Sequence, residues 1–289
     1  MPRPSRVSPS KTKQRAKPST KTNTGGVLDF AEVIEETEDD FISLGIFGAS
    51  ATGKTTLWSG FPGPTLALFC SGNLKNPGEL KSLSKEEKSH ITALKITSTD
   101  QLVSVISSLA KDMQGFVTVV IDHLTSISDM IVADMLGVDK AKPQKEWGDM
   151  SQQEWGKFSS NLKIILRDFL DLEANSIIVC QEKIFEPPED SEIGITKVGP
   201  AVTPGVAQWL TSTLNYSIQT FVRAKTVEKK INVRGKEKTK IVKLDELQFC
   251  AYLPLSEHRM TKFRKPRGIK LDPVMVDPTY EKLKAVINQ

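Results

Sequence analysis

Short apolar runs alternate with longer segments of helical periodicity over most of the chain after residue 40. The runs are rich in Val, Ile, Leu and Phe and predict strands at residues 41–47, 65–70, 90–96, 116–122 and 176–180. The fourth run is apolar at nearly every position, which is typical of a strand covered on both faces of a parallel sheet. Strands that alternate with helices at this spacing predict an α/β domain with a mostly parallel sheet and helices on both faces.

Helices are predicted in the segments between these runs. One opens at Lys54, and another begins at Ser98 or Thr99, where a capping residue precedes apolar positions at helical spacing. Two more are expected over about 126–136 and about 151–172. The last helix carries an apolar stripe that we interpret as core, formed by Trp155, Phe158, Leu162, Ile165, Leu166 and Phe169.

The pattern changes to β after residue 213. Apolar and polar residues alternate from Leu214 to Ile218, and two β-rich segments, 218–232 and 239–253, are separated by a short Gly-containing stretch. Two such segments around a Gly-containing connection predict an antiparallel hairpin. We expect this hairpin to extend the parallel sheet at its C-terminal end.

Charge divides the chain further. Residues 1–28 carry seven Lys or Arg and no acid, with Pro, Ser and Thr between them, which predicts a disordered basic arm. Six acids follow within 32–40, so we expect 29–40 to be an acidic linker. The remainder, 41–289, is expected to be one domain that includes the hairpin and a basic C-terminal segment within 213–270. The basic arm is either a solvated tail or a segment that touches nucleic acid.

Composition argues against a membrane-spanning or exported protein. No apolar run approaches the roughly 20 residues that a membrane span needs, and the N-terminal residues lack the apolar centre of a secretory signal. Cys70, Cys180 and Cys250 are far apart and lie in apolar surroundings, which predicts buried, reduced thiols without a metal. We expect a cytoplasmic protein without a membrane partner.

The strongest chemical signal is Gly-Ala-Ser-Ala-Thr-Gly-Lys-Thr at 48–55, which matches the phosphate-binding loop G-x-x-x-x-G-K-[ST]. Its glycines permit backbone conformations that other residues resist, so that N–H groups can surround an anion. Lys54 is expected to reach the β- and γ-phosphates of ATP, and Thr55 to offer its hydroxyl to Mg²⁺. The predicted nucleotide-binding residues in this segment are Gly48, Ala49, Ser50, Ala51, Thr52, Gly53, Lys54, Thr55 and Thr56.

A second signal completes the predicted magnesium site. Mg²⁺ keeps several waters, and a carboxylate at the tip of a neighbouring strand usually helps to hold it. Asp122 ends the apolar run at 116–122, where such a residue is expected. We therefore predict Thr55 and Asp122 as the metal-binding residues; the alternative is that Asp122 only caps the following helix.

Three motifs resemble the RecA-like ATPase core, and more narrowly the short phage-encoded RecA-like ATPases linked to single-strand annealing and recombination. These motifs are Gly48–Thr56, Val119–Thr125 and Ile177–Glu182. The first two are specific for P-loop proteins, and the likeness extends over roughly 41–287. Weaker additional similarities lie at Trp155–Lys157, Gly199–Gly205 and Thr261–Arg267. The resemblance implies a phage protein of the host cell cytoplasm.

The resemblance also implies contacts with single-stranded DNA. In RecA-like proteins a glutamine at the end of the strand senses the γ-phosphate and leads into a DNA-binding loop, and Gln181 matches that position. The corresponding loop is 184–204, and an earlier one is 137–152, which contains Lys140, Lys142, Lys145 and Trp147. Lysines beside an aromatic residue suit sequence-tolerant single-strand binding. Because 184–192 is acidic, plain surface loops remain the alternative for both.

A further implication of the resemblance is self-assembly into a ring or filament. Lys262 and Arg264 resemble the Lys-x-Arg pair that related ATPases insert into the nucleotide site of the neighbouring subunit, where a cation stabilises transferring phosphate. Catalytic roles are therefore expected for Lys54, Asp122, Gln181 and Arg264. The alternatives are a solvated face or a DNA-facing patch formed by Arg259, Lys262, Arg264, Lys265 and Arg267.

One position departs from the pattern of the family. RecA-like enzymes usually carry a water-polarising glutamate after the second strand, but this strand continues as Cys70-Ser-Gly-Asn73, and the nearest acid is Glu79. His123 or Gln181 are candidates for positioning the water instead. ATP binding is therefore better supported than fast hydrolysis. The resemblance implies a DNA-dependent ATPase that assembles on single-stranded DNA, with a single-strand-binding protein as a further partner. A non-hydrolysing, ATP-gated DNA-binding protein and a helicase or packaging motor are the alternatives.

Overall fold

A computed structural model describes the part of the chain that follows the predicted arm and linker. The described residues are 41–70, 78–137, 150–187, 194–233, 236–265 and 267–288, with backbone alone for 78–79 and 228–241. They belong to one compact unit, Phe41–Gln289. The basic arm and the acidic linker lie outside the described residues, and the proposed division of the chain stays a prediction.

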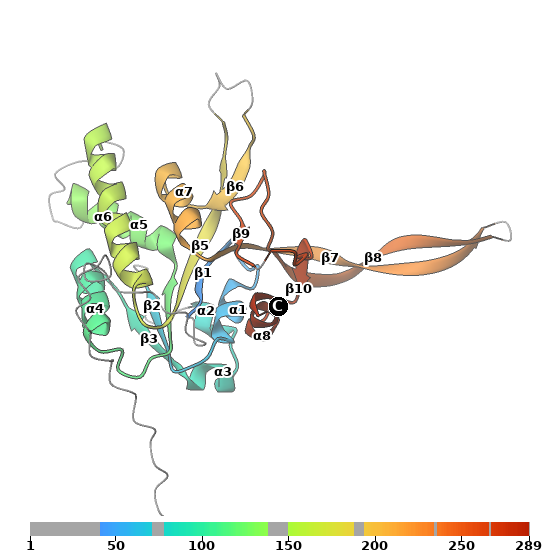
Figure 1. The fold of residues 1–289 in the computed structure, drawn as a ribbon, viewed down its shortest axis with the longest axis horizontal. Helices are drawn as coiled ribbons and strands as arrows, with labels where there is room; N and C mark the ends of the chain where they lie inside the picture. Colours follow the sequence, from blue (N-terminus) through green and yellow to red (C-terminus); the bar gives the residue numbers. More distant parts are fainter. Residues whose placement is uncertain are drawn as a thin grey trace, which may run out of the picture. The chain divides into compact units, whose positions relative to one another are not determined.

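A mixed sheet of ten strands forms the centre of this unit (Figure 1). The strands are β1 (Ser43–Gly48), β2 (Thr65–Phe69), β3 (Ile91–Lys95), β4 (Thr118–Asp122), β5 (Asn175–Phe185), β6 (Lys197–Pro200), β7 (Tyr216–Val233), β8 (Lys236–Tyr252), β9 (Lys262–Phe263) and β10 (Val274–Val276). Their order across the sheet is β10-β8-β7-β1-β5-β4-β2-β3, with β6 paired to β5 and β9 paired to β7. Neighbouring strands from β7 to β3 are parallel to one another. β8 is antiparallel to β7, and β10 is antiparallel to β8. The predicted α/β class is confirmed.

Helices cover both faces of the sheet. They are α1 (Lys54–Ser59), α2 (Gly78–Lys81), α3 (Lys85–Ser89), α4 (Thr99–Lys111), α5 (Leu124–Leu136), α6 (Gln152–Leu170), α7 (Pro204–Thr213) and α8 (Tyr280–Ile287). Buried residues of α4 to α7 pack in one core, and those of α1 and α8 pack in a second core on the opposite face. Among the described residues, no helix has both the length and the apolar character needed to cross a membrane.

The central strands contribute to both cores, which explains their continuous apolar sequence. In β4, Val119 and Ile121 point into the core formed with α4 to α7, whereas Val120 points into the core formed with α1 and α8. All three are completely buried. Successive side chains of a strand point to opposite faces, so both faces of this strand require apolar residues.

Polar caps fix the beginnings of two predicted helices. The Ser98 hydroxyl accepts a hydrogen bond from the Gln101 amide at the start of α4. At the start of α6, Ser151 and Glu154 form a reciprocal capping box. Such caps satisfy amides that have no partner within the helix. Both helices therefore begin where the sequence predicted.

The prediction that the whole apolar stripe of α6 belongs to the core is wrong at Trp155. Trp155 is 40% exposed and contacts Phe158 edge-on, whereas Phe158 and the later stripe residues are buried. The residues of the first helical turn are exposed or half-buried on all sides of the helix. Helical periodicity indicates which face is apolar, but it does not indicate how far the packing partners extend along the helix.

The segment after Gln181 differs from the predicted loop. β5 continues to Phe185 and pairs antiparallel with β6, so that residues 184–204 contain a two-stranded extension and the first residue of α7. Residues 188–193 lie outside the described residues, as do 138–149, which hold the lysines and the tryptophan of the other predicted DNA loop.

The predicted hairpin is confirmed as β7 and β8, which pair antiparallel from Gln219–Tyr252 to Val233–Lys236 with an irregularity between Ala224 and Thr226. The first residues of β7 lie beside β1, and the end of β8 lies beside β10. The rest of the hairpin extends away from the parallel sheet (Figure 1).

All three cysteines are buried and free of disulfides, as the sequence predicted. Burial raises the pKa of the Cys70 thiol to about 12 and that of Cys180 to about 11, and the negative charge of Asp122 adds to the effect at Cys70.

Leu162→Ala is expected to lower the free energy of unfolding by about 2–5 kcal/mol, because Leu162 is completely buried and its removal leaves a cavity. Ile164→Ala, on the same helix at a 54% exposed position, serves as the control and is expected to cost less than about 1 kcal/mol. Urea denaturation measures both. Equal losses for the two variants would contradict the assigned packing of α6.

Candidate functional site

The loop from Gly48 to Thr55 connects β1 to α1 and lies against β7. A Cβ atom on Gly48 would lie 2.4 Å from the Thr220 carbonyl oxygen, so no larger residue fits without displacing β7. Gly53 precedes α1 with a φ of 85°, which favours glycine. Both glycines of the motif are therefore required by the geometry of the loop.

The side chain of Thr52 fastens the loop to the sheet. Its hydroxyl donates to the Ala49 carbonyl at 2.9 Å and shares a hydrogen bond of 2.8 Å with the hydroxyl of Thr220. Both threonines are buried. Thr220 was not among the predicted site residues, because only the pairing of β7 with β1 brings it to the loop.

Lys54 is buried and its ammonium group bends back over the loop. Nζ donates to the Gly48 carbonyl at 2.8 Å and to the Ala49 carbonyl at 2.6 Å. Burial lowers the pKa of Lys54, and the negative charge of Asp122 partly opposes this effect. A buried ammonium held only by carbonyl dipoles is a favourable partner for an entering phosphate.

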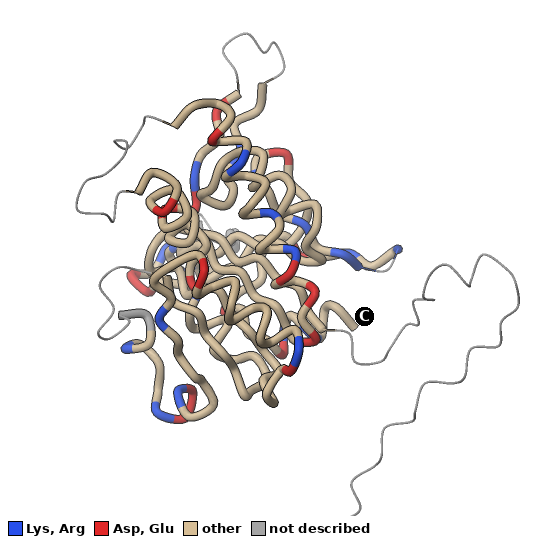
Figure 2. Tube along the Cα trace, turned by 90° about the vertical axis from the view of Figure 1, so that its left-hand side faces the viewer, with Lys and Arg blue, Asp and Glu red and all other residues tan. Residues whose placement is uncertain are grey.

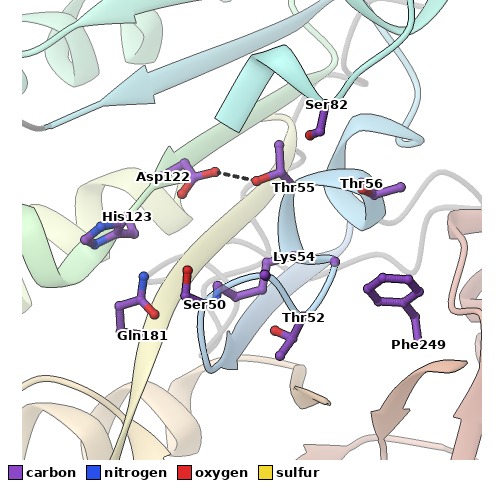
Figure 3. A pocket seen from close by; sticks show the side chains of 12 residues that line it. Ser50, Thr52, Lys54, Thr55, Thr56, Ser82, Asp122, His123, Gln181 and Phe249 are labelled. Carbon is purple, nitrogen blue, oxygen red and sulfur yellow. Dashed lines mark hydrogen bonds between the residues drawn. The ribbon is translucent and has the colours of Figure 1, made fainter. Parts of the chain in front are cut away.

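Asp122, at the end of β4, lies beside Thr55 and Trp58 of α1. Its Oδ2 accepts a hydrogen bond from Trp58 Nε1 at 2.9 Å and lies 3.5 Å from the Thr55 hydroxyl (Figure 3). The structure therefore brings the predicted Thr55 and Asp122 together. Trp58 was missed, although its spacing of three residues from Thr55 on a helix places both on one face.

These groups fit a magnesium ion. A hydroxyl and a carboxylate are oxygen ligands of the kind that Mg²⁺ prefers, and the ion takes its remaining ligands from phosphate and water. The described residues contain no group of three or more His, Cys, Asp or Glu that could hold a metal without such help. Thr55 and Asp122 would hold the ion only together with a nucleotide.

Gln181 and His123 lie on the same side of the site as Asp122 (Figure 3). Gln181 is level with Gly48 across the parallel pair β1–β5, and its backbone N–H donates to the Thr125 hydroxyl at 3.3 Å. His123 caps α5 by accepting at Nδ1 from the Ser126 amide at 3.2 Å.

A cavity of about 490 Å³ opens over the loop, within the usual range for small-molecule sites. It is lined by Ser50, Ala51, Thr52, Gly53, Lys54, Thr55, Thr56, Ser82, Asp122, His123, Gln181 and Phe249. Asp122, His123 and Gln181 lie at one end, and Thr56 and Phe249 lie at the other (Figure 3). The cavity thus has a polar end and an aromatic end, with the phosphate-binding loop between them.

Phe249 was not predicted from the sequence. It belongs to β8, the residue is 42% exposed, and one ring carbon lies 3.2 Å from where a Cβ of Gly53 would be. Its position depends on the order β1-β7-β8 within the sheet, because that order brings the base of the hairpin to the loop. No local pattern in the sequence signals this contact.

Lys262 and Arg264 do not reach this cavity. β9 pairs with β7 at Tyr216 and Ser217, at the opposite end of the parallel strands from the loop. Lys262 Nζ donates to the Ser212 carbonyl at 2.6 Å, and Arg264 is exposed. No partner subunit is present, so their insertion into a neighbouring site stays a prediction.

The predicted basic patch is partly engaged in packing. The guanidinium of Arg259 lies 3.9 Å from the ring centroid of Tyr252, which is itself stacked on Phe221. Such a stack stabilises the base of the hairpin. The exposed members of the patch, Arg264, Lys265 and Arg267, remain available to solvent or to a partner.

Asp122 is the one acid in the described lining of the cavity. The glutamate that RecA-like enzymes usually carry after the second strand is absent from the sequence. Phe69, the last residue of β2, is in register with Asp122, and residues 71–77 after it lie outside the described residues. Water activation by a second carboxylate therefore has no support from the described side chains.

Comparisons with known proteins agree with this geometry at the level of the family. The family described as "AAA domain" matches residues 40–243. No curated protein matches the chain. A solved structure of "a prototypical ATPase from the type III secretion system of pathogenic bacteria" is similar over 61% of this chain and 50% of its own, with 16% identity and a TM-score of 0.37.

The present chain thus spans about half the length of that ATPase, and the likeness is too weak to carry a functional argument. The family match covers more than half of the chain and includes the loop, Asp122, Gln181 and most of the hairpin. The chain therefore belongs to the AAA domain family of P-loop ATPases.

Proposed function

We propose that this chain binds ATP with Mg²⁺ and hydrolyses it as a DNA-dependent ATPase that assembles on single-stranded DNA. The observation that carries the nucleotide part is the convergence of Lys54, Thr55 and Asp122 around one cavity over a loop that requires its glycines. The resemblance to phage RecA-like ATPases motivates the DNA part, with a role in annealing, recombination or repair in the cytoplasm of a host cell.

Each residue of the site has a role in this proposal. The loop amides and Lys54 would bind the phosphates, and Thr55 and Asp122 would hold a magnesium ion, which would supply positive charge to the phosphates. Trp58 keeps the Asp122 carboxylate in position through its N–H group. Gln181 and His123, at the polar end of the cavity, orient the attacking water.

Self-assembly completes the site in this proposal. A cation that stabilises the transferring phosphate is needed at the polar end, and among the described residues Lys54 is the only cation that lines the cavity. Arg264 is exposed on another part of the unit, where a neighbouring copy can receive it. A ring or filament would supply this residue to each site.

A second candidate is an ATP-gated DNA-binding protein that scarcely hydrolyses ATP. It is favoured by the single carboxylate in the described lining of the cavity. Phosphate release measured beside nucleotide affinity separates the two functions, because repeated turnovers exclude the second candidate.

Lys54→Ala is expected to reduce ATP turnover at least about 100-fold, because phosphate loses its buried cation. Turnover of the unaltered protein is expected to rise with added single-stranded DNA. Lys111→Ala, an exposed change on α4, is the control and should leave both properties unchanged. A flat response to DNA would exclude DNA dependence without excluding nucleotide binding.

Trp58→Phe is expected to raise several-fold the Mg²⁺ concentration needed for tight ATP binding, because a smaller aromatic ring remains while the hydrogen bond to Asp122 is lost. Fluorescence titration with an ATP analogue over a range of Mg²⁺ concentrations measures the change. Binding in EDTA is expected to stay the same. An unchanged Mg²⁺ dependence would refute the positioning role of Trp58.

Phe249, at the aromatic end of the cavity, is proposed to stack on the base of ATP. Phe249→Ala is therefore expected to weaken ATP binding about 5- to 30-fold, since a stacked base contributes about 1–2 kcal/mol. Binding of inorganic triphosphate, which has no base, should not change. Leu247→Ala, at a 69% exposed position on the same strand, is the matched control. If triphosphate binding fell equally, Phe249 would act on the loop and not on the base.

A further inference from the structure

Beyond the irregularity at Ala224, the described pairings of the β7–β8 hairpin are those between its own two strands. Its ladder runs from the pair Thr226–Lys243 to the pair Val233–Lys236, beyond the irregularity at Ala224. The pairings of β1, β9 and β10 with this hairpin all lie nearer its base. The hairpin therefore presents two faces whose residues are set by the register.

The register separates the charges of these two faces. One face, here called the lysine face, holds the positions Val227, Lys229, Ile231, Val233, Lys236, Lys238, Lys240 and Val242. The opposite face holds Thr226, Glu228, Lys230, Asn232, Glu237, Thr239, Ile241 and Lys243. The lysine face has four lysines and no acid, whereas the opposite face has two lysines and two glutamates.

The lysine face has a regular arrangement along β8. Lys236, Lys238 and Lys240 occupy every second position, about 6.8 Å apart in an extended strand. Lys240 is directly opposite Lys229 across the ladder. Like charges in such a pair destabilise an isolated hairpin, and a bound anion relieves this cost.

General solubility does not explain this asymmetry. Lysines on an exposed ribbon prevent aggregation whichever face they occupy. Along the rest of the described chain, basic and acidic positions are interspersed (Figure 2). On the hairpin, in contrast, the register places four lysines and no acid on one face.

We propose that the lysine face binds the phosphate backbone of single-stranded DNA, independently of sequence. A flexible single strand can set successive phosphates along a straight row of cations, whereas the backbone of a duplex winds away from it. The positions opposite Lys236 and Lys238 on β7 are the aliphatic Val233 and Ile231, which would offer apolar surface to sugars and bases. This inference rests on the proposed function only for the class of partner, and it assigns the contact to the hairpin instead of the loops at 137–152 and 184–204.

Two double variants with equal change in charge test the proposal. Lys238→Gln with Lys240→Gln alters the lysine face, and Lys230→Gln with Lys243→Gln alters the opposite face of the same ladder. Fluorescence anisotropy of labelled oligo-dT, titrated with the full chain without nucleotide at several salt concentrations, measures affinity and its salt dependence. ATP affinity confirms that each variant is folded.

The lysine-face variant is expected to bind oligo-dT about tenfold more weakly, and the slope of log K against log salt should decrease in magnitude by about 1.4, for two lost phosphate contacts. The opposite-face variant should change affinity less than about twofold. Equal effects of the two variants, no effect of either, or equally strong competition by an unlabelled duplex would overturn the proposal.

The same experiment separates this proposal from the proposed function. Lys54→Ala should reduce ATP turnover at least about 100-fold and leave oligo-dT binding by the lysine face unchanged. If turnover does not respond to DNA while the lysine-face variant still loses oligo-dT affinity, DNA-dependent hydrolysis fails and the DNA-binding face stands. If turnover responds to DNA but both variants bind alike, this inference fails alone.

Discussion

The close approach of β1 and β7 at Gly48 is the constraint on which the site depends. Because Gly48 has no Cβ, the backbone of the loop passes directly beside Thr220, and Thr52 can bond to the Thr220 hydroxyl. With the loop fixed in this way, the carbonyls of Gly48 and Ala49 hold the Lys54 ammonium. The following helix then directs its first turn toward the end of β4. A backbone contact between two strands thus determines where cation, hydroxyl and carboxylate meet.

The part of the site that the sequence predicted is the part defined by local pattern. The loop motif specifies its own conformation, and a continuous apolar run ending in Asp122 specifies a central strand with a carboxylate at its tip. Helical spacing from Thr55 also contains the signal for Trp58. Thr220 and Phe249 were beyond such reasoning, since they reach the loop only through the lateral order β1-β7-β8. The exposure of Trp155 was likewise not predictable, because helical periodicity indicates the apolar face of a helix but not which elements pack against it.

The electrostatics of the cavity favour nucleotide binding more clearly than fast cleavage. Burial disfavours the charged form of Lys54, and an entering phosphate compensates that cost, so the site gains from an anion. In contrast, Asp122 is the one acid in the described lining and is already bound to Trp58 Nε1. In the proposed mechanism, Gln181 and His123 orient the attacking water. A site of this kind suits a slow ATPase in which the bound state of the nucleotide controls another event.

Strand β8 connects the nucleotide cavity with the lysine face, and control of DNA binding by nucleotide requires such a connection. Phe249 lies at the aromatic end of the nucleotide cavity, and Lys236, Lys238 and Lys240 lie further out on the same strand. If nucleotide shifts Phe249, the paired strands β7 and β8 carry that shift to the lysine face as one unit. Linkage then requires DNA to change nucleotide affinity by the factor by which nucleotide changes DNA affinity. A nucleotide that binds the shifted and the unshifted hairpin equally well would produce no coupling. The contact between nucleotide and Phe249 must therefore differ between these two conformations.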